Sequence, residues 1–152
     1  MIKWDCIEKL NDERFIAEFE QEIGWVLPES YKVFVRENNS CQPEKRTCFS
    51  VDGNEVELNH FYNLNKGSVI SIWDFYDFPE EDRKWFKEQY GGELNDHIAF
   101  ADDTDGNAVC FYKVDGSVTH YDRENDKMST VAPDFAAFLA ALYVRDTDET
   151  VD

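Results

Sequence analysis

Leu27-Pro28-Glu29-Ser30-Tyr31-Lys32-Val33-Phe34-Val35 is the stretch that decides where a helix begins in this chain. Pro28 suits the first position of a helix, because its missing N–H is not needed there and its ring already holds a helical φ. Glu29 follows in the first turn, where the helix macrodipole favours negative charge. The apolar residues then recur on one face, at Tyr31, Phe34 and Val35, and the pattern ends at Asn38-Asn39. The spacing predicts an amphipathic helix that begins at Pro28.

A second amphipathic helix precedes this one. Asp12 is a candidate N-cap and Gly24 can close the helix in a left-handed conformation. Its apolar residues recur at helical spacing, at Phe15, Ile16, Phe19 and Ile23. We expect the two helices to pack through Phe19, Ile23, Tyr31 and Phe34.

The pattern Ile16-x-x-Phe19-Glu20-x-x-Ile23-Gly24-x-x-Leu27-Pro28-x-x-Tyr31-x-x-Phe34-Val35 resembles the opening of the SUKH superfamily, the Smi/Knr-type cell-wall assembly regulator domain. Ile98-Ala99-Phe100-Ala101-Asp102-Asp103 with Gly106-Asn107-Ala108-Val109-Cys110-Phe111 looks like that family's central hairpin. Phe135-x-x-Phe138-Leu139-x-x-Leu142 looks like its closing helix, which we expect to join the same core. The resemblance covers residues 12–142. It departs from the family where Asn39 is followed by Ser40, since the family usually has Asn-Gly there.

The centre of the chain is rich in predicted strands. Thr47–Val51 and Glu55–Leu58 flank Asp52-Gly53-Asn54, which is typical of a hairpin turn. A second hairpin is predicted from Val109–Val114 and Ser117–Tyr121, joined by Asp115-Gly116. Strands inside and helices outside favour an α+β fold. We expect one SUKH-like domain over residues 1–145, with a mainly antiparallel curved sheet covered by N-terminal, middle and C-terminal helices, and a disordered acidic tail over residues 146–152.

The formal net charge of -18 restricts the class of partner. Acidity at this level repels phosphate backbones, so direct binding to nucleic acid is excluded as the main function. A basic protein partner is favoured, because complementary fields speed encounter. Solubility alone also explains an acidic composition.

The cysteines and the apolar runs indicate a cytoplasmic protein. Cys6, Cys41, Cys48 and Cys110 are scattered without a Cys-x-x-Cys pair, so we expect buried thiols, with a Cys41–Cys48 disulfide as the alternative. The N-terminus lacks the pattern of a secretory signal peptide. No apolar run reaches the roughly twenty residues that cross a bilayer.

Ser71-Ile72-Trp73-Asp74-Phe75-Tyr76-Asp77-Phe78-Pro79-Glu80-Glu81-Asp82 is the strongest candidate for binding a partner, because aromatic anchors alternate with acids. In the other interpretation, Trp73, Phe75 and Phe78 cover the core while the acids face water and begin a helix at Pro79. That middle helix would bury Trp85 and Phe86 and end at Gly91. The candidate contact residues are Trp73, Tyr76, Asp77, Glu80, Glu81 and Asp82, with Asp102, Asp103 and Asp105 as a weaker second group.

No catalytic or metal motif stands out. Asp102-Asp103-Thr104-Asp105-Gly106-Asn107 has the composition of a calcium loop, but the first loop position falls on Ala101 and the twelfth on Tyr112, so a turn between strands is favoured. His60, His97 and His120 lack metal-ligand spacing, and we expect them at the surface or at a sheet edge. We therefore expect neither a metal nor a cofactor, and no enzymatic activity.

The resemblance implies a function, because SUKH domains are best known as bacterial immunity proteins that bind and neutralise a cognate polymorphic toxin, often a nuclease. We expect a monomeric or weakly self-associating immunity protein that occludes a basic toxin stoichiometrically. The alternatives are an intracellular regulatory or scaffold module, and an uncharacterised enzyme that uses carboxylates such as Asp102 and Asp103.

Overall fold

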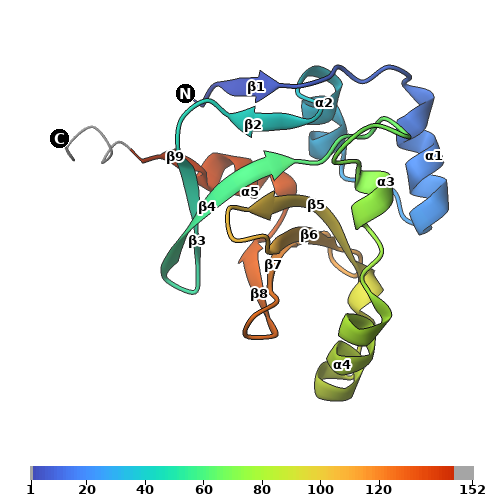
Figure 1. The fold of residues 1–152 in the computed structure, drawn as a ribbon, viewed down its shortest axis with the longest axis vertical. Helices are drawn as coiled ribbons and strands as arrows, with labels where there is room; N and C mark the ends of the chain where they lie inside the picture. Colours follow the sequence, from blue (N-terminus) through green and yellow to red (C-terminus); the bar gives the residue numbers. More distant parts are fainter. Residues whose placement is uncertain (1, 146–152) are drawn as a thin grey trace.

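Antiparallel strands form the centre of the structure, a computed structural model that describes residues 2–145 (Figure 1). The predicted acidic tail over residues 146–152 lies outside the described residues. The strands are β1 (Trp4–Cys6), β2 (Cys41–Pro43), β3 (Thr47–Val51), β4 (Asn54–Phe61), β5 (His97–Asp103), β6 (Ala108–Tyr112), β7 (Val118–Asp122), β8 (Lys127–Ala132) and β9 (Tyr143–Val144). The helices are α1 (Arg14–Ile23), α2 (Glu29–Glu37), α3 (Ile72–Phe75), α4 (Glu80–Tyr90) and α5 (Phe135–Ala141), with a 3₁₀ turn at Leu94–Asp96.

One curled sheet carries most of the strands, in the order β8-β7-β6-β5-β4-β3-β9. Each pair of neighbours is antiparallel, and β1 and β2 form a separate ribbon. The sheet curls far enough for β3 to contact β8, although the two are not neighbours in it. The predicted α+β class is confirmed. Within residues 2–145, no helix has the length and apolar character needed to span a membrane.

One face of the sheet packs against α2 and the closing helix α5, while Phe19 of α1 packs on Trp73 and Tyr76. The Tyr31 ring of α2 lies 5.0 Å from Phe111 and 5.3 Å from Phe135 between ring centroids. The predicted core residues are buried, namely Phe19, Ile23, Tyr31, Phe135, Phe138 and Leu142. Phe34 is the exception, because it packs only partly buried at the margin of this core.

The opposite face of the sheet is covered by α4 and the segment before it. Neighbouring residues on a strand point to opposite faces, so Phe111 faces α2 while Tyr112 faces the other way. Tyr112 stacks on His97 with centroids 4.5 Å apart, and His97 in turn contacts Phe86 of α4. Phe78, just before α4, packs on Tyr121 of β7. Figure 1 shows α4 at the far end of the molecule from α1 and α2.

The helix ends follow the predicted sequence features to within two residues. Pro28 and Pro79 stand directly before α2 and α4, whose first residues are Glu29 and Glu80. Gly24 closes α1 at φ 66°, and Gly91 closes α4 at φ 78°, the left-handed conformation that glycine adopts without a steric cost. Asp12 accepts a hydrogen bond from the Arg14 N–H at 2.9 Å, although α1 begins at Arg14 itself.

The turns were predicted in part. The first hairpin forms where it was predicted, but its turn is Asp52-Gly53 alone, with positive φ of 50° and 82°, because Asn54 already pairs with Val51. The Asp115-Gly116 connection is longer than the predicted two residues, because β6 ends at Tyr112 and β7 begins at Val118. Ser40 has φ 55°, so the turn after α2 keeps the conformation that a glycine would take there.

The expectation of four thiols is wrong for two cysteines. Cys6 and Cys41 face one another across β1 and β2 and form a disulfide, while Cys48 and Cys110 are free and buried. The alternative pairing of Cys41 with Cys48 is also wrong. The sequence distance of 35 residues between Cys6 and Cys41 is closed by strand pairing, which spacing alone does not reveal.

The expectation for the histidines is also wrong, because all three are buried in the sheet. His97 lies on β5 within hydrogen-bond distance of Thr119, with 3.0 Å between Nδ1 and Oγ1. His120 lies on β7, with its Nε2 2.8 Å from Asp103 Oδ2. His97 and His120 stand on β5 and β7, whose residues are buried on both faces of the sheet, so alternation along these strands does not mark a solvent-exposed side.

Burial gives His97 a predictable effect on stability. Its desolvation lowers its pKa from 6.5 to about 4. Between pH 6.5 and about 4, His97 is protonated in the unfolded chain but not in the folded chain. The contribution of neutral His97 to the free energy of unfolding is therefore complete above pH 6.5 and is lost as the pH falls to about 4. The loss should approach about 3 kcal/mol, measured by urea unfolding at several pH values. His97→Gln should flatten this part of the pH profile, and an equal slope in both proteins would contradict the assignment.

Candidate functional site

A buried network of asparagines holds the segment that leads into α3. Glu8 Oε1 accepts hydrogen bonds from Asn63 Nδ2 at 2.7 Å and from Asn65 Nδ2 at 3.0 Å. These hydrogen bonds, with another from Ser68, lower the pKa of Glu8. Ser71 donates to the Asn65 carbonyl and accepts from the Trp73 N–H, so it caps α3. The network thereby fixes the start of the segment from Ser71 to Asp82, in which aromatic and acidic residues alternate.

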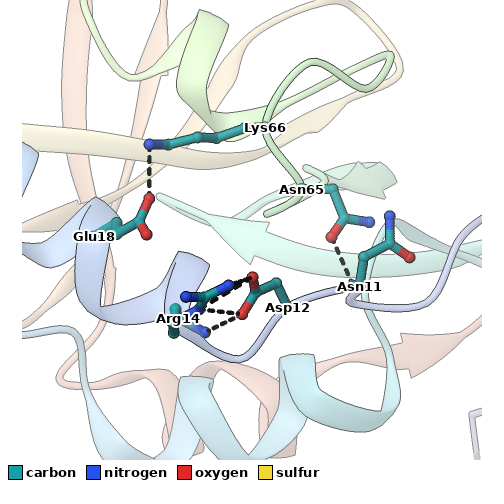
Figure 2. Close-up of polar contacts among 6 residues, drawn as sticks. All are labelled: Asn11, Asp12, Arg14, Glu18, Asn65 and Lys66. Carbon is teal, nitrogen blue, oxygen red and sulfur yellow. Dashed lines mark hydrogen bonds and ion pairs between the residues drawn. The ribbon is translucent and has the colours of Figure 1, made fainter.

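Trp73, a predicted contact residue, already makes its polar and ring contacts within the chain. Its Nε1–H donates to the Leu64 carbonyl at 2.9 Å, and its ring packs edge-on against Phe19 of α1. Lys66 Nζ lies 4.4 Å from the centroid of the Trp73 ring, a cation–π contact. Figure 2 shows the same lysine reaching Glu18 of α1, where Nζ and Oε1 are 2.7 Å apart. Trp73 therefore joins α3 to α1.

Tyr76 is held in the same way. Its ring lies 5.5 Å from Phe19, and its hydroxyl donates to Glu22 Oε2 at 2.8 Å. Partial burial and this carboxylate raise the pKa of Tyr76 to about 12. The side chain is half-buried against α1, so it is a weaker anchor candidate than the sequence suggested.

Phe75 is the uncovered aromatic of this stretch, with 45% of its surface exposed. Its ring stacks on Tyr62 with centroids 4.7 Å apart, and Tyr62 contacts His60 edge-on. His60 Nδ1 lies 3.0 Å from Asp102 Oδ1. This chain of contacts connects α3 to Asp102, which the sequence could not show. One of the two interpretations of the sequence placed Phe75 over the core on the basis of alternation, whereas Ile72–Phe75 form one turn of helix that leaves Phe75 exposed.

The acids beside Phe75 face solvent. Asp77, Glu80 and Glu81 are exposed, while Asp82 is half-buried. Asp77 accepts a hydrogen bond from Asn95 Nδ2 at 2.7 Å, and Glu80 and Glu81 lie in the first turn of α4. Negative charge there is favoured by the helix macrodipole. We call Phe75, Asp77, Glu80 and Glu81 the α3–α4 surface.

The second group of predicted contact residues is divided by the fold. Asp103 is buried at 2% exposure, so its side chain is not a surface contact. Asp103 Oδ1 accepts the N–H groups of Asp105 and Asn107, both at 2.9 Å, as in a side-chain-stabilised turn. Burial alone would raise the pKa of Asp103, but the hydrogen bonds from His120 and these N–H groups outweigh it and lower the pKa. Asp105 is exposed at the turn and Asp102 is half-buried.

The arrangement supports recognition of a partner through charge and one aromatic ring. In the part of the chain that the structure describes, no three His, Cys, Asp or Glu side chains are placed to hold a metal ion. The α3–α4 surface offers an exposed ring beside carboxylates, a combination suited to a partner with apolar and basic side chains.

Comparison with known proteins finds one family. Residues 11–141 match the SMI1 / KNR4 family (SUKH-1), which covers most of the 152-residue chain. No curated protein matches the chain.

Proposed function

Because the chain belongs to the SMI1 / KNR4 family (SUKH-1), a family of immunity and regulatory protein-binding domains, we propose that it is an immunity protein for a basic, nuclease-type toxin. It would act by binding the toxin stoichiometrically and occluding it. No cofactor is needed for this function. A regulatory or scaffold module that binds a non-toxic partner is the second candidate, since membership of the family fits both.

The α3–α4 surface is the observation that carries this proposal. Phe75 offers an exposed ring that is rigidly supported by Tyr62, so little side-chain entropy is lost on binding. Asp77, Glu80 and Glu81 follow it closely in the chain and add exposed negative charge. The net charge of -18 would attract a basic domain and repel nucleic acid.

Reversing three charges should separate recognition from folding. In the variant Asp77→Lys, Glu80→Lys, Glu81→Lys, we expect association with the toxin to slow by about tenfold or more at low salt, because steering charges act mainly on the association rate. Raising the salt concentration should reduce the difference between the variant and the natural chain, since fields are screened within about 10 Å at 0.1 M. The measurement is stopped-flow or surface-based kinetics at several salt concentrations.

The matched control reverses three other exposed acids, Asp5, Glu37 and Glu44, and so changes the net charge equally. It should keep most of the association rate if location matters. Equal slowing in both variants would assign the effect to total charge, and normal binding by the first variant would place the interface elsewhere. A thermal melt of each variant shows whether it has folded.

The choice between immunity protein and scaffold requires the partner. Affinity capture with the full chain from its native cell identifies that partner, which is then expressed alone and together with this chain. A partner that kills the cell alone and is neutralised by this chain at one-to-one stoichiometry supports immunity. A harmless partner overturns immunity in favour of the scaffold.

Our proposal places the protein in the cytoplasm, where disulfides are rare. Cys6 and Cys41 would then face one another as thiols until oxidised. Alkylation of intact cells followed by mass spectrometry measures their state: modified thiols support this location, and a protected disulfide contradicts it.

A further inference from the structure

A pocket of about 350 Å³ lies between the β3–β4 hairpin and strands β7 and β8. The curl of the sheet creates it, because β3 approaches β8 without pairing with it. Its lining combines two valines with polar side chains, including Val51, Val56, Asp52, Asn54, Asp122 and His120. It is separate from the α3–α4 surface, and none of the residues predicted to bind a partner lines it.

The pocket already holds a cationic group of this chain. Lys127 Nζ lies 3.1 Å from Asp52 Oδ2, and Ser129 donates to the same oxygen at 2.7 Å. The Lys127 side chain is 61% exposed, so the ion pair is solvated and displacing Lys127 costs little free energy. Asp52 thus binds a cation that another basic group can replace.

The buried end of the pocket supplies a further acceptor. The Asp103 carboxylate only accepts hydrogen bonds, so His120 Nε2 carries the hydrogen in the contact between them. In neutral His120 this leaves Nδ1 as an acceptor, and Nδ1 has no hydrogen-bond partner within residues 2–145. Asp122 adds a second carboxylate to the lining.

We propose that this pocket binds the guanidinium group of an arginine side chain from a protein partner, in competition with Lys127. Arginine fits the lining better than lysine does, because its planar group carries five donors for several separate acceptors. Its methylene groups match the walls formed by Val51 and Val56. The choice of a protein as the source rests on the proposed function, whereas the chemistry of the pocket does not.

The test titrates the full chain with Nα-acetyl-L-arginine amide and follows backbone amide shifts by NMR. We expect weak binding, with a Kd of about 1–10 mM, and shifts centred on Asn54, His120 and Ser129. The isosteric citrulline derivative lacks the charge and should bind at least about tenfold more weakly. Equal binding of the two compounds, or shifts elsewhere on the chain, would overturn the proposal.

Two variants should move the affinity in opposite directions. Asp52→Asn should weaken binding about tenfold, because it removes the carboxylate. Asn tolerates the left-handed φ of 50° at this turn, so the hairpin is retained. Lys127→Met should tighten binding about threefold by vacating Asp52. Lys87→Met is the matched control, since Lys87 of α4 pairs with Glu93 beyond the end of that helix and lines no part of this pocket.

Unchanged affinity in folded Asp52→Asn, or no gain in Lys127→Met, would overturn the proposal. If Asp52→Asn fails to melt cooperatively, Asp122→Asn replaces it as the test of the carboxylates. The experiment uses no partner, so its failure leaves the proposed immunity function intact. Failure to find a toxin equally leaves the arginine titration valid.

Discussion

Replacing Phe138 by alanine is expected to lower the free energy of unfolding by about 3–5 kcal/mol. Phe138 has no exposed surface, and its ring lies 5.3 Å from Phe49 and 6.1 Å from Phe100. These rings belong to α5, β3 and β5, so the cavity would open where the closing helix meets the sheet. Close-packed neighbours on rigid strands cannot collapse into it fully. Urea unfolding monitored by fluorescence measures the loss.

Two other phenylalanines calibrate this result. Phe75→Ala removes the same atoms from an exposed position and should cost less than about 1 kcal/mol. Phe34→Ala should fall between the two, at about 2 kcal/mol, because Phe34 is partly buried between Trp4 and Phe61. If Phe138→Ala cost no more than Phe75→Ala, the closing helix would not pack as described.

Breaking the Cys6–Cys41 disulfide is expected to destabilise the oxidised protein by about 3–4 kcal/mol. The bond closes a loop of 35 residues that includes α1 and α2, and the entropy lost by such a loop in the unfolded chain gives this magnitude. Cys6→Ser is the suitable change, since Cys6 is exposed and serine fits there, while Cys41 is fully buried. Chemical unfolding with and without a reductant measures the effect.

The variant also serves as the control for reduction. Reductant should lower the stability of the natural chain to that of Cys6→Ser and leave Cys6→Ser unchanged. Cys48 and Cys110 are free in both proteins, so they cannot produce a difference. Equal stability of the oxidised and reduced natural chain would contradict a stabilising disulfide.

The candidate site was only partly predictable. The sequence identified the acids Asp77, Glu80 and Glu81, because a proline followed by acids marks a helix start and helix starts are exposed to solvent. It named Trp73 and Tyr76 as contact residues and left out Phe75. Tyr76 and Trp73 are covered by α1 and by Lys66, whereas Phe75 is exposed. Alternation within a short stretch cannot predict which of its residues are covered by α1, a helix formed by residues far away in the sequence.

The pocket beside His120 was beyond the sequence altogether. Asp52, His120 and Lys127 stand on separate strands or turns, and only the curl of the sheet brings them to one place. No local pattern encodes that curvature.

The sequence by itself determined the features that depend on residues close together in the chain. Helical spacing placed α1 and α2, and together with the family resemblance it placed α5. Prolines and glycines marked where helices begin and end, and Asp52-Gly53 formed its turn because both residues tolerate positive φ. Only the tertiary structure decided the pairing of Cys6 with Cys41, the burial of His97 and His120, and the exposure of Phe75. These depend on contacts between residues far apart in the chain, whose free energies are set by the packing of whole elements and not by local conformational preference.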